Sequence, residues 1–517
     1  MGTVISTPSQ PGDDAVLAIE THISTVFFTA TRAYKLLKPL RTGFLDHVDV
    51  DDRVRAVSRE YELNRRLAPD VYLGTSDLYE DGVLADRVLI MRRLPATRRL
   101  SHLVDDPGFL DHLRRIAHVV AAFHASIPMV GDPYPMATAE GLSSLWDSSF
   151  NEIEPSVGDV IERAEFERVR RLATDYLQHS DELFEQRRRS GMVRDVHGDL
   201  IAEDIFMLDD GPRILDCVAF DDDYRISDVL ADIAFLVMDV ERLSGPDAAF
   251  RLMRWYCDFS GEHHPESLAH HYVAYRAHVR AKIALLRVRQ GDLDAADRAR
   301  ALHAQALDHL EVSRRRVVLI GGGPGAGKTT LANAIAERLN WSVIDSDTLR
   351  KDLHGIDYDD HDVEKHPDLY DDATTTATYN RLCEHAAALL RAGESVVIDA
   401  TWSDEAQRAR ARDVARRHGA EVTEFECRLD PAIARQRIAE RRRRGQSASD
   451  ATIELVETMT ERRHPWPTAT PLDTTHSPDD ALAEAVRNLS DPTPSRQRFG
   501  IPSRPAVADE DDRGTGR

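Results

Sequence analysis

A glycine-rich loop between an apolar run and a helical pattern constrains this chain more than any other stretch. The loop and the residue after it are Gly322, Gly323, Pro324, Gly325, Ala326, Gly327, Lys328, Thr329 and Thr330. They match the pattern G-x-x-x-x-G-K-[ST]. The preceding residues 316–320 predict a buried strand, and Leu331, Ile335 and Leu339 recur on one face of a predicted helix. A strand, a glycine loop and a helix in this order predict a phosphate-binding loop, because backbone N–H groups and the helix N-terminus then face the phosphates.

Two side chains of this loop have distinct expected roles. Lys328 would reach the β- and γ-phosphates of ATP, and the Thr329 hydroxyl would ligate Mg²⁺. Only six of the 66 basic residues are lysine, so a compact ammonium at this position differs from the chain's usual guanidinium. The alternative is a glycine-rich turn that holds no ligand. We expect ATP and Mg²⁺ as the cofactors of this part of the chain.

Acidic residues end the next apolar stretches after the loop. Residues 343–347 predict a short strand that ends in Asp345 and Asp347, and Asp347 would orient the hydroxyl of an acceptor. Arg350 would hold the substrate or a phosphate group. The competing interpretation is that Asp345 or Asp347 caps the next helix. A further apolar strand ends in Asp399, which would hold Mg²⁺ through water.

A basic helical face follows a predicted strand over residues 422–429. Arg437 and Arg441 are four residues apart and therefore share one face of a helix. We expect this pair to form a lid that brings positive charge to the phosphoryl group during transfer. The adjoining arginines 442–444 are more typical of a solvated surface, because arginine is the usual basic residue of this chain.

A second group of polar residues has the spacing of a kinase catalytic loop and its metal-binding strand. The group comprises His197, Gly198 and Asp199, followed by Asp204 and Asp216. Asp199 would accept or orient the proton of an attacking hydroxyl. Asp204 and Asp216 would ligate Mg²⁺, because this hard cation prefers oxygen ligands. The alternative is that these aspartates only cap turns.

A lysine and a glutamate farther upstream complete this second group. Lys35 lies on the second strand of a predicted hairpin, and Glu60 lies on a predicted helix over residues 52–67. Kinases use such a lysine to reach the α- and β-phosphates and pair it with a glutamate on a helix. The order of Lys35, Glu60, Asp199, Asp204 and Asp216 therefore predicts a second ATP-binding site.

The segment from His197 to Leu200, with Asp216 at the end of an apolar strand, resembles the aminoglycoside phosphotransferase family of kinase-like enzymes. Over residues 18–490 the chain is similar to bacterial two-domain proteins that fuse such a domain to a P-loop kinase domain. Further similar stretches are residues 20–24, 64–70 and 228–232. The P-loop part resembles gluconate-kinase-like, polynucleotide-kinase-like and zeta-toxin-like domains of the wider AAA-type P-loop group.

The sequence departs from the aminoglycoside phosphotransferase pattern at three places. Asp204 stands where the family has asparagine, and it adds negative charge beside Asp216 and the phosphates. Ile201 and Ala202 stand where related loops often carry a polar residue, and the hairpin over residues 20–35 has no glycine-rich phosphate loop. These departures concern the activity of this part of the chain more than its fold.

Length and composition bound the remaining expectations. A chain of 517 residues predicts two or three domains. The net charge of −23 argues against nucleic acid as a partner, because its phosphates require a basic surface. No apolar run is long enough to span a membrane, the N-terminus does not resemble a signal peptide, and the four cysteines are scattered, which fits a cytoplasmic protein.

We expect an α+β protein-kinase-like N-terminal domain followed by an α/β P-loop NTPase domain with a parallel sheet. The expected segments are a flexible N-terminus (1–17), the kinase-like domain (18–312), the P-loop kinase domain (313–490) and a disordered tail (491–517). Within the kinase-like domain, residues 159–190 predict one long charged helical stretch.

The expected function is transfer of a phosphoryl group from ATP to a hydroxyl of a small molecule. Two alternatives stay open at this point. The N-terminal domain could be a pseudokinase that regulates a P-loop kinase, as the aspartate at position 204 suggests. The whole protein could instead be a nucleotide-dependent switch or scaffold. Asp347 argues against the switch, because a switch needs no carboxylate that orients a hydroxyl.

Overall fold

The chain forms two compact units, each assembled from three separate segments. The computed structural model describes residues 17–21, 23–41, 46–130, 134–357, 367–444 and 464–489, without the side chains of residues 367, 368, 431 and 441–444. The first unit comprises residues 1–160, 184–262 and 272–306, and the second comprises residues 161–183, 263–271 and 307–517. The expectations for residues 1–16 and for the tail 491–517 lie outside the described residues.

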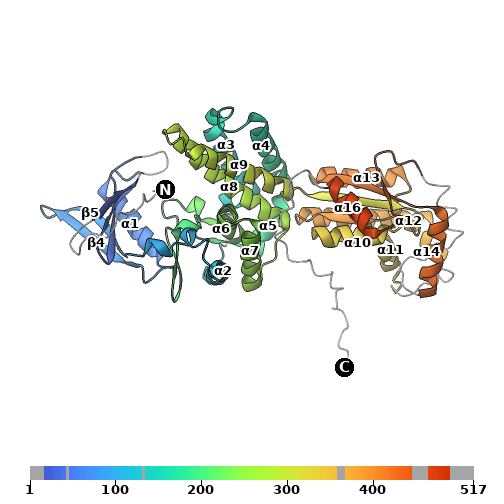
Figure 1. Ribbon diagram of the computed structural model, residues 1–517, viewed down its shortest axis with the longest axis horizontal. Helices are drawn as coiled ribbons and strands as arrows, with labels where there is room; N and C mark the ends of the chain where they lie inside the picture. Colours follow the sequence, from blue (N-terminus) through green and yellow to red (C-terminus); the bar gives the residue numbers. More distant parts are fainter. Residues whose placement is uncertain are drawn as a thin grey trace, which may run out of the picture. The chain divides into compact units, whose positions relative to one another are not determined.

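A five-stranded antiparallel sheet opens the first unit (Figure 1). Its strands, in the spatial order β1-β2-β3-β5-β4, are β1 (Leu17–Glu20), β2 (Ser24–Phe28), β3 (Arg32–Leu37), β5 (Val83–Arg92) and β4 (Tyr72–Glu80). Helix α1 (Val50–Asn64) packs on this sheet through buried Val57, which joins Leu37 and Leu89 in one apolar cluster. The sheet and helix thus carry the two segments in which Lys35 and Glu60 were expected.

Helices and two short two-stranded sheets form the rest of the first unit. The helices are α2 (Phe109–Ser126), α3 (Ala139–Ile153), α6 (Val229–Ser244) and α7 (Pro246–Ser260), while α5 (Asp181–Arg189), α8 (Glu266–Arg289) and α9 (Ala295–Ser313) contribute residues to both units. The paired strands are β6 (Val193–Asp195) with β9 (Ile226–Asp228), and β7 (Ile205–Leu208) with β8 (Gly211–Ile214). The start of α6 is buried as a continuous run over residues 229–240, so it forms the centre of this helical region.

The second unit contains a five-stranded parallel sheet. The strand order is β11 (Ser342–Asp345), β12 (Val396–Asp399), β10 (Arg316–Gly322), β13 (Glu421–Arg428) and β14 (Thr470–Asp473). The helices are α4 (Arg163–Leu177), α10 (Lys328–Leu339), α11 (Ser346–His354), α12 (Asp372–Arg391), α13 (Glu405–Arg417), α14 (Pro431–Arg444) and α16 (Pro478–Leu489). Parallel strands need both faces covered, which explains why β10 and β12 are almost continuously apolar.

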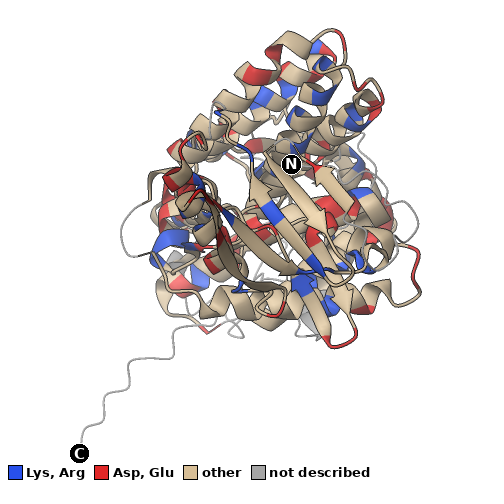
Figure 2. Cartoon of the chain, turned by 90° about the vertical axis from the view of Figure 1, so that its left-hand side faces the viewer, with Lys and Arg blue, Asp and Glu red and all other residues tan. Residues whose placement is uncertain are grey.

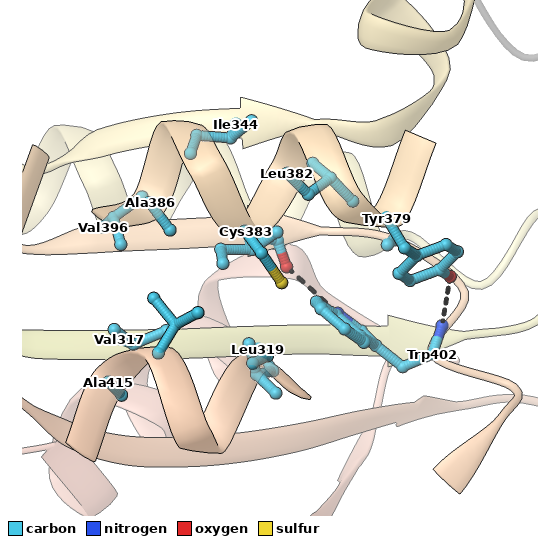
Figure 3. Close-up of a cluster of buried hydrophobic side chains, with 14 of the residues drawn as sticks. Val317, Leu319, Ile344, Tyr379, Leu382, Cys383, Ala386, Val396, Trp402 and Ala415 are labelled. Atoms are coloured by element: carbon cyan, nitrogen blue, oxygen red, sulfur yellow. Dashed lines mark hydrogen bonds between the residues drawn. The ribbon is translucent and has the colours of Figure 1, made fainter. Parts of the chain in front are cut away.

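Alternate residues of β10 face opposite layers of this sandwich. Val317 and Leu319 pack with α12 and α13 in the cluster of Figure 3, where Trp402 is fully buried and its backbone N–H donates to the Tyr379 hydroxyl (3.1 Å). Val318 and Ile320, on the other face of β10, pack with α10 and α16. A period of two residues along a strand produces this division. The sheet thus lies between two layers of helices, which hold its strands in position. Parallel α/β sheets bind ligands at the carboxyl ends of their strands.

Arg315, immediately before β10, anchors the opposite end of the second unit. Its side chain is 2% exposed, and its guanidinium donates to the carbonyl oxygens of Tyr176 (2.9 Å), His179 (2.8 Å) and Leu390 (3.3 Å). These carbonyls lie at the C-terminal ends of α4 and α12, where helix carbonyls lack intrahelical partners and carry partial negative charge. Burial lowers the pKa of Arg315, and two helix ends supply the compensation that a carboxylate would otherwise give.

Glu394, in the turn between α12 and β12, makes the stability of the second unit depend on pH. Burial raises the pKa of this carboxyl to about 7, although the charge of His264 opposes the shift. Its favourable contribution is complete below the unfolded pKa near 4.5 and is lost as pH rises through 7. We expect Glu394→Gln to raise the free energy of unfolding by about 1–2 kcal/mol at pH 8 and to leave it unchanged at pH 4.5.

Urea unfolding at the two pH values measures this difference. Glu384→Gln, an exposed position on α12, is the matched control and should change little at either pH. An equal gain for Glu394→Gln at both pH values would show that the carboxyl does not titrate between the folded and unfolded states.

Figure 2 shows basic and acidic segments interleaved along the helices in the upper part of the view. Among the described residues, each helix is either too short or too polar to cross a lipid bilayer.

Candidate active sites

The glycine-rich loop connects β10 to α10 with a backbone that requires glycine. Gly322, Gly325 and Gly327 have φ values of 147°, 75° and 83°, a region that side chains disfavour. A Cβ atom on Gly322 would lie 2.8 Å from the Cys427 carbonyl oxygen, and one on Gly325 would lie 3.0 Å from the Ala434 carbonyl oxygen. Gly327 then caps α10 at its N-terminus. The loop therefore has the close-packed form that aims backbone N–H groups and the helix N-terminus at one point.

The functional side chains of the loop meet the end of the neighbouring strand. The Thr329 hydroxyl donates to Asp399 Oδ2 (2.5 Å), and Lys328 Nζ donates to the Gly323 carbonyl oxygen (3.2 Å). Asp399 is 1% exposed, and burial raises its pKa to about 7 despite the nearby charge of Lys328. A Mg²⁺ ion would supply the positive charge that this buried carboxylate lacks. The residues present therefore fit the two groups expected from the sequence.

The two aspartates at the start of α11 have different partners. Asp345 caps the helix, because its carboxylate accepts from the Thr348 backbone N–H (2.7 Å), as the competing interpretation expected. Asp347 instead accepts from Arg350 Nη1 (2.8 Å). Arg350 is only 6% exposed and lies 4.8 Å from the centre of the Tyr370 ring. Among the described residues its Nε has no hydrogen-bond partner, which leaves a buried donor for a ligand.

Of the two predicted lid arginines, Arg437 is described and lies beside the loop. Its Nη2 donates to the carbonyl oxygens of Thr474 (2.9 Å) and Thr475 (3.1 Å), and its Nη1 would lie 3.8 Å from a Cβ on Gly327. The guanidinium thus joins α14 to the segment after β14 at the edge of the loop. The side chain of Arg441 lies outside the described residues, although its backbone continues α14.

The kinase-like group assembles in the first unit around Lys35. Lys35 Nζ donates to Glu60 Oε1 (2.7 Å) and lies 3.8 Å from Asp216 Oδ1. Burial alone would lower the pKa of Lys35, but the charges of Glu60 and Asp216 raise it, so the ammonium stays protonated. Asp216 has a φ of 63°, which is uncommon for an aspartate. The strand β3, the helix α1 and the segment after β8 thus converge on one cation.

Asp199 and Asp204 bring two further carboxyl groups to this region. Burial raises the pKa of Asp199 to about 7, with the Arg280 charge opposing the shift, and one carboxyl oxygen of Asp199 is buried without a hydrogen bond. The pKa of Asp204 is raised, mainly by burial and further by the negative charges of Asp216 and Asp199. The negative charges of Asp216 and Asp199 thus act on Asp204, and a bound divalent cation would relieve this repulsion.

Asp232, on α6, holds the catalytic loop in place and was not singled out from the sequence. Its carboxylate accepts the backbone N–H groups of His197 (3.2 Å) and Gly198 (2.7 Å) and is 3.0 Å from His124 Nε2. Burial alone would raise the pKa of Asp232, but the hydrogen bond and charge of His124 and the charge of His197 hold it at about 2. The sequence signals were the family-like stretch 228–232 and an aspartate in the apolar first half of a helix, where an unpaired carboxylate is costly.

Comparisons with known proteins find matches to part of the chain and to nearly all of it. Residues 317–466 match the family model described as AAA domain. An uncharacterized protein of Mycobacterium tuberculosis is 34% identical over 473 residues, which cover 90% of this chain and 94% of that protein, and an uncharacterized protein of Mycobacterium bovis matches equally well.

Solved structures resemble the two parts separately. A gluconokinase from Sinorhizobium meliloti 1021 is 20% identical and covers 34% of this chain and 93% of its own, with a TM-score of 0.26. The GDP and kanamycin complex of APH(2")-IIia is 15% identical and covers 57% of this chain and 94% of its own, with a TM-score of 0.38. The predicted fold class, a kinase-like α+β domain before a parallel α/β P-loop domain, is confirmed.

Proposed function

This chain belongs to the same family as the mycobacterial proteins that match it almost end to end, and we propose that it is an ATP-dependent phosphotransferase acting on a hydroxyl of a small molecule. The observation that carries the proposal is the meeting of Lys328, Thr329 and Asp399 at the end of a glycine loop. Backbone N–H groups of the loop bind the phosphates, and Lys328 turns from the Gly323 carbonyl to the β- and γ-oxygens.

Mg²⁺ would neutralise the charge that develops between the β- and γ-phosphates, held by Thr329 and, through water, by Asp399. Asp347 orients the acceptor hydroxyl, and Arg350 binds the acceptor through its free Nε donor. Arg437 lies at the loop edge, where it brings positive charge to the bound nucleotide. Arg441, one turn farther along α14, completes this lid.

The kinase-like site is proposed to bind ATP and Mg²⁺ as well. Lys35, oriented by Glu60, reaches the α- and β-phosphates, and Asp204 and Asp216 ligate the metal. Asp199 accepts the proton of the attacking hydroxyl, a role that fits a carboxyl whose pKa lies near neutral pH. The partners of the protein are then ATP and a small-molecule acceptor, without membrane or nucleic acid. The side chains of all four cysteines are buried, and the proposal places the reaction in the reducing cytoplasm.

One observation favours a second candidate, in which the kinase-like part binds a ligand and regulates the P-loop kinase. Asp204 places a carboxylate where an amide would leave the site less negative. The added negative charge would weaken binding of the anionic nucleotide, and such a site would serve regulation better than catalysis. The pair of Lys35 and Glu60 supports the active alternative, because kinases use such a lysine to hold the α- and β-phosphates.

ADP release from the full chain tests these roles, with pooled sugars, aminoglycosides and nucleotides as acceptors. We expect Lys328→Ala and Asp199→Asn each to remove turnover of a different subset of acceptors by at least about 100-fold, and the double variant to remove both. Lys282→Ala, which removes a surface ion pair with Glu152, is the control and should match the wild type.

Each other outcome has a definite meaning. Turnover that survives Asp199→Asn for every acceptor would establish the regulatory candidate. Wild-type turnover by Lys328→Ala would refute the P-loop site as a kinase. ATP binding without ADP release from any variant would favour the nucleotide-dependent switch.

A further inference from the structure

A pocket in the first unit lies beside the catalytic loop and is not used by the proposed nucleotide chemistry. Its apolar wall includes Phe184, Leu142, Tyr224, Tyr272 and Tyr275. A Cβ atom on Gly198 would lie 2.8 Å from the Tyr224 carbonyl oxygen, so one wall of the pocket touches the residue before Asp199. Apolar walls with a few polar groups are typical of sites for small molecules.

Two of the three charged residues that line this pocket have protein partners. Asp228 accepts two hydrogen bonds from Arg187 (2.7 and 2.8 Å) and one from the Tyr272 hydroxyl (3.4 Å). Asp223, which is exposed, accepts from the Tyr134 hydroxyl (2.5 Å). The charge of Asp228 is therefore compensated inside the protein, and Asp223 carries negative charge at the solvent side.

Arg276 is the third charged residue, and it has no carboxylate partner among the described residues. It is 8% exposed, its Nε donates to the Ala231 carbonyl oxygen at 3.3 Å, and its guanidinium lies 4.7 Å from the centre of the Phe235 ring. One carbonyl oxygen and the ring faces compensate this nearly buried cation only in part, so a ligand anion would supply the charge partner that it lacks. The Arg276 charge also acts electrostatically on Asp199, which directly follows Gly198 at the pocket wall.

We propose that Arg276 binds the carboxylate of the acceptor in this pocket, so that the kinase-like site phosphorylates a small hydroxyl compound that carries a carboxylate. The inference rests on the phosphotransferase function proposed above. The acceptor oxygen forms a bond to the γ-phosphorus of ATP while the bond from that phosphorus to the β,γ-bridging oxygen breaks. ADP leaves, and the hydroxyl proton passes to Asp199. Asp223 in the same pocket disfavours a dianionic phosphate ester relative to a carboxylate, because it repels the second charge.

Matched acceptors test this assignment in the full chain carrying Lys328→Ala, which isolates the kinase-like site. The sets are glycerate with glycerol and glycerol 3-phosphate, and gluconate with glucitol and glucitol 6-phosphate. We expect kcat/KM for a carboxylate compound to exceed that of its neutral and phosphorylated counterparts by at least about tenfold. Arg276→Met should abolish this preference through a higher KM with little change in kcat, and Arg276→Lys should retain part of it, because lysine keeps the charge without the planar fork.

The control is Arg251→Met, at an exposed position on α7, which should keep the preference. Far-ultraviolet circular dichroism and ATP binding establish that Arg276→Met is folded. Equal use of neutral and carboxylate compounds, or preference for the phosphate ester, would overturn the role of Arg276 while leaving the phosphotransferase intact. Absence of any turnover in the Lys328→Ala background, with turnover in the wild type, would overturn the inference together with activity at this site but would leave the P-loop kinase standing.

Discussion

Lys35→Met should lower phosphotransfer by the kinase-like site at least 100-fold and destabilise the sheet that carries it by about 3 kcal/mol. The rate falls because the variant loses the cation that would meet the α- and β-phosphates. The stability falls because Glu60, 8% exposed, then keeps a buried carboxyl without the ammonium at 2.7 Å. Breaking one side of a buried ion pair typically costs about 3–5 kcal/mol.

A double variant separates the two effects. Lys35→Met with Glu60→Gln removes the orphaned charge, so we expect it to regain most of the stability and none of the activity. ADP release in the Lys328→Ala background measures the rate. Hydrogen exchange of peptides from β3 and α1 measures stability, where about 3 kcal/mol corresponds to exchange on the order of 100-fold faster. Near-normal turnover by either variant would show that Lys35 has only a structural role.

Arg315→Met should destabilise the second unit by about 3 kcal/mol, although Arg315 precedes β10 and the phosphate loop follows the other end of this strand. The substitution leaves the carbonyl oxygens of Tyr176, His179 and Leu390 buried without their donor. Each unsatisfied buried polar group costs about 1–3 kcal/mol, and the two helix ends also lose the cation that their dipoles favour.

Hydrogen exchange of peptides from α4, α12 and β10 measures this loss. Arg391→Met is the matched control, because Arg391, at the end of α12, pairs with Glu182 at an exposed position and should contribute less than about 1 kcal/mol. Exchange in α4 that is unchanged by Arg315→Met would show that α4 does not depend on this guanidinium.

The sequence predicted those parts of the sites whose residues are close together or follow a fixed order. The glycine loop and Asp399 were predicted because each depends on local backbone chemistry at the end of a strand. Lys35 and Glu60 were predicted from their order, and the structure places them 2.7 Å apart. From the sequence alone, Asp345 could cap the next helix or lie at the site beside Asp347. The hydrogen bond that it accepts from the Thr348 backbone N–H shows that it caps the helix.

Other features depend on contacts between distant residues and could not be predicted. The single helical stretch expected over residues 159–190 is in fact two helices, α4 and α5. The chain turns at residues 178–180, which include no glycine or proline, so no residue there indicates the break. The support that Asp232 gives to Gly198 crosses 34 residues of sequence. The contact of Arg437 with Thr474 likewise joins a helix to a strand end that follows it by 37 residues.

The interrupted course of the chain through its two units limits how such a protein can be made and rearranged. Residues 161–183 belong to the second unit, although residues 184–262 return to the first. No single cut in the gene therefore separates one intact unit from the other, and an exchange of halves by one recombination event would leave both incomplete. During synthesis, α4 must also wait for Arg315 and for the end of α12 to emerge from the ribosome before its last carbonyl groups find their donor.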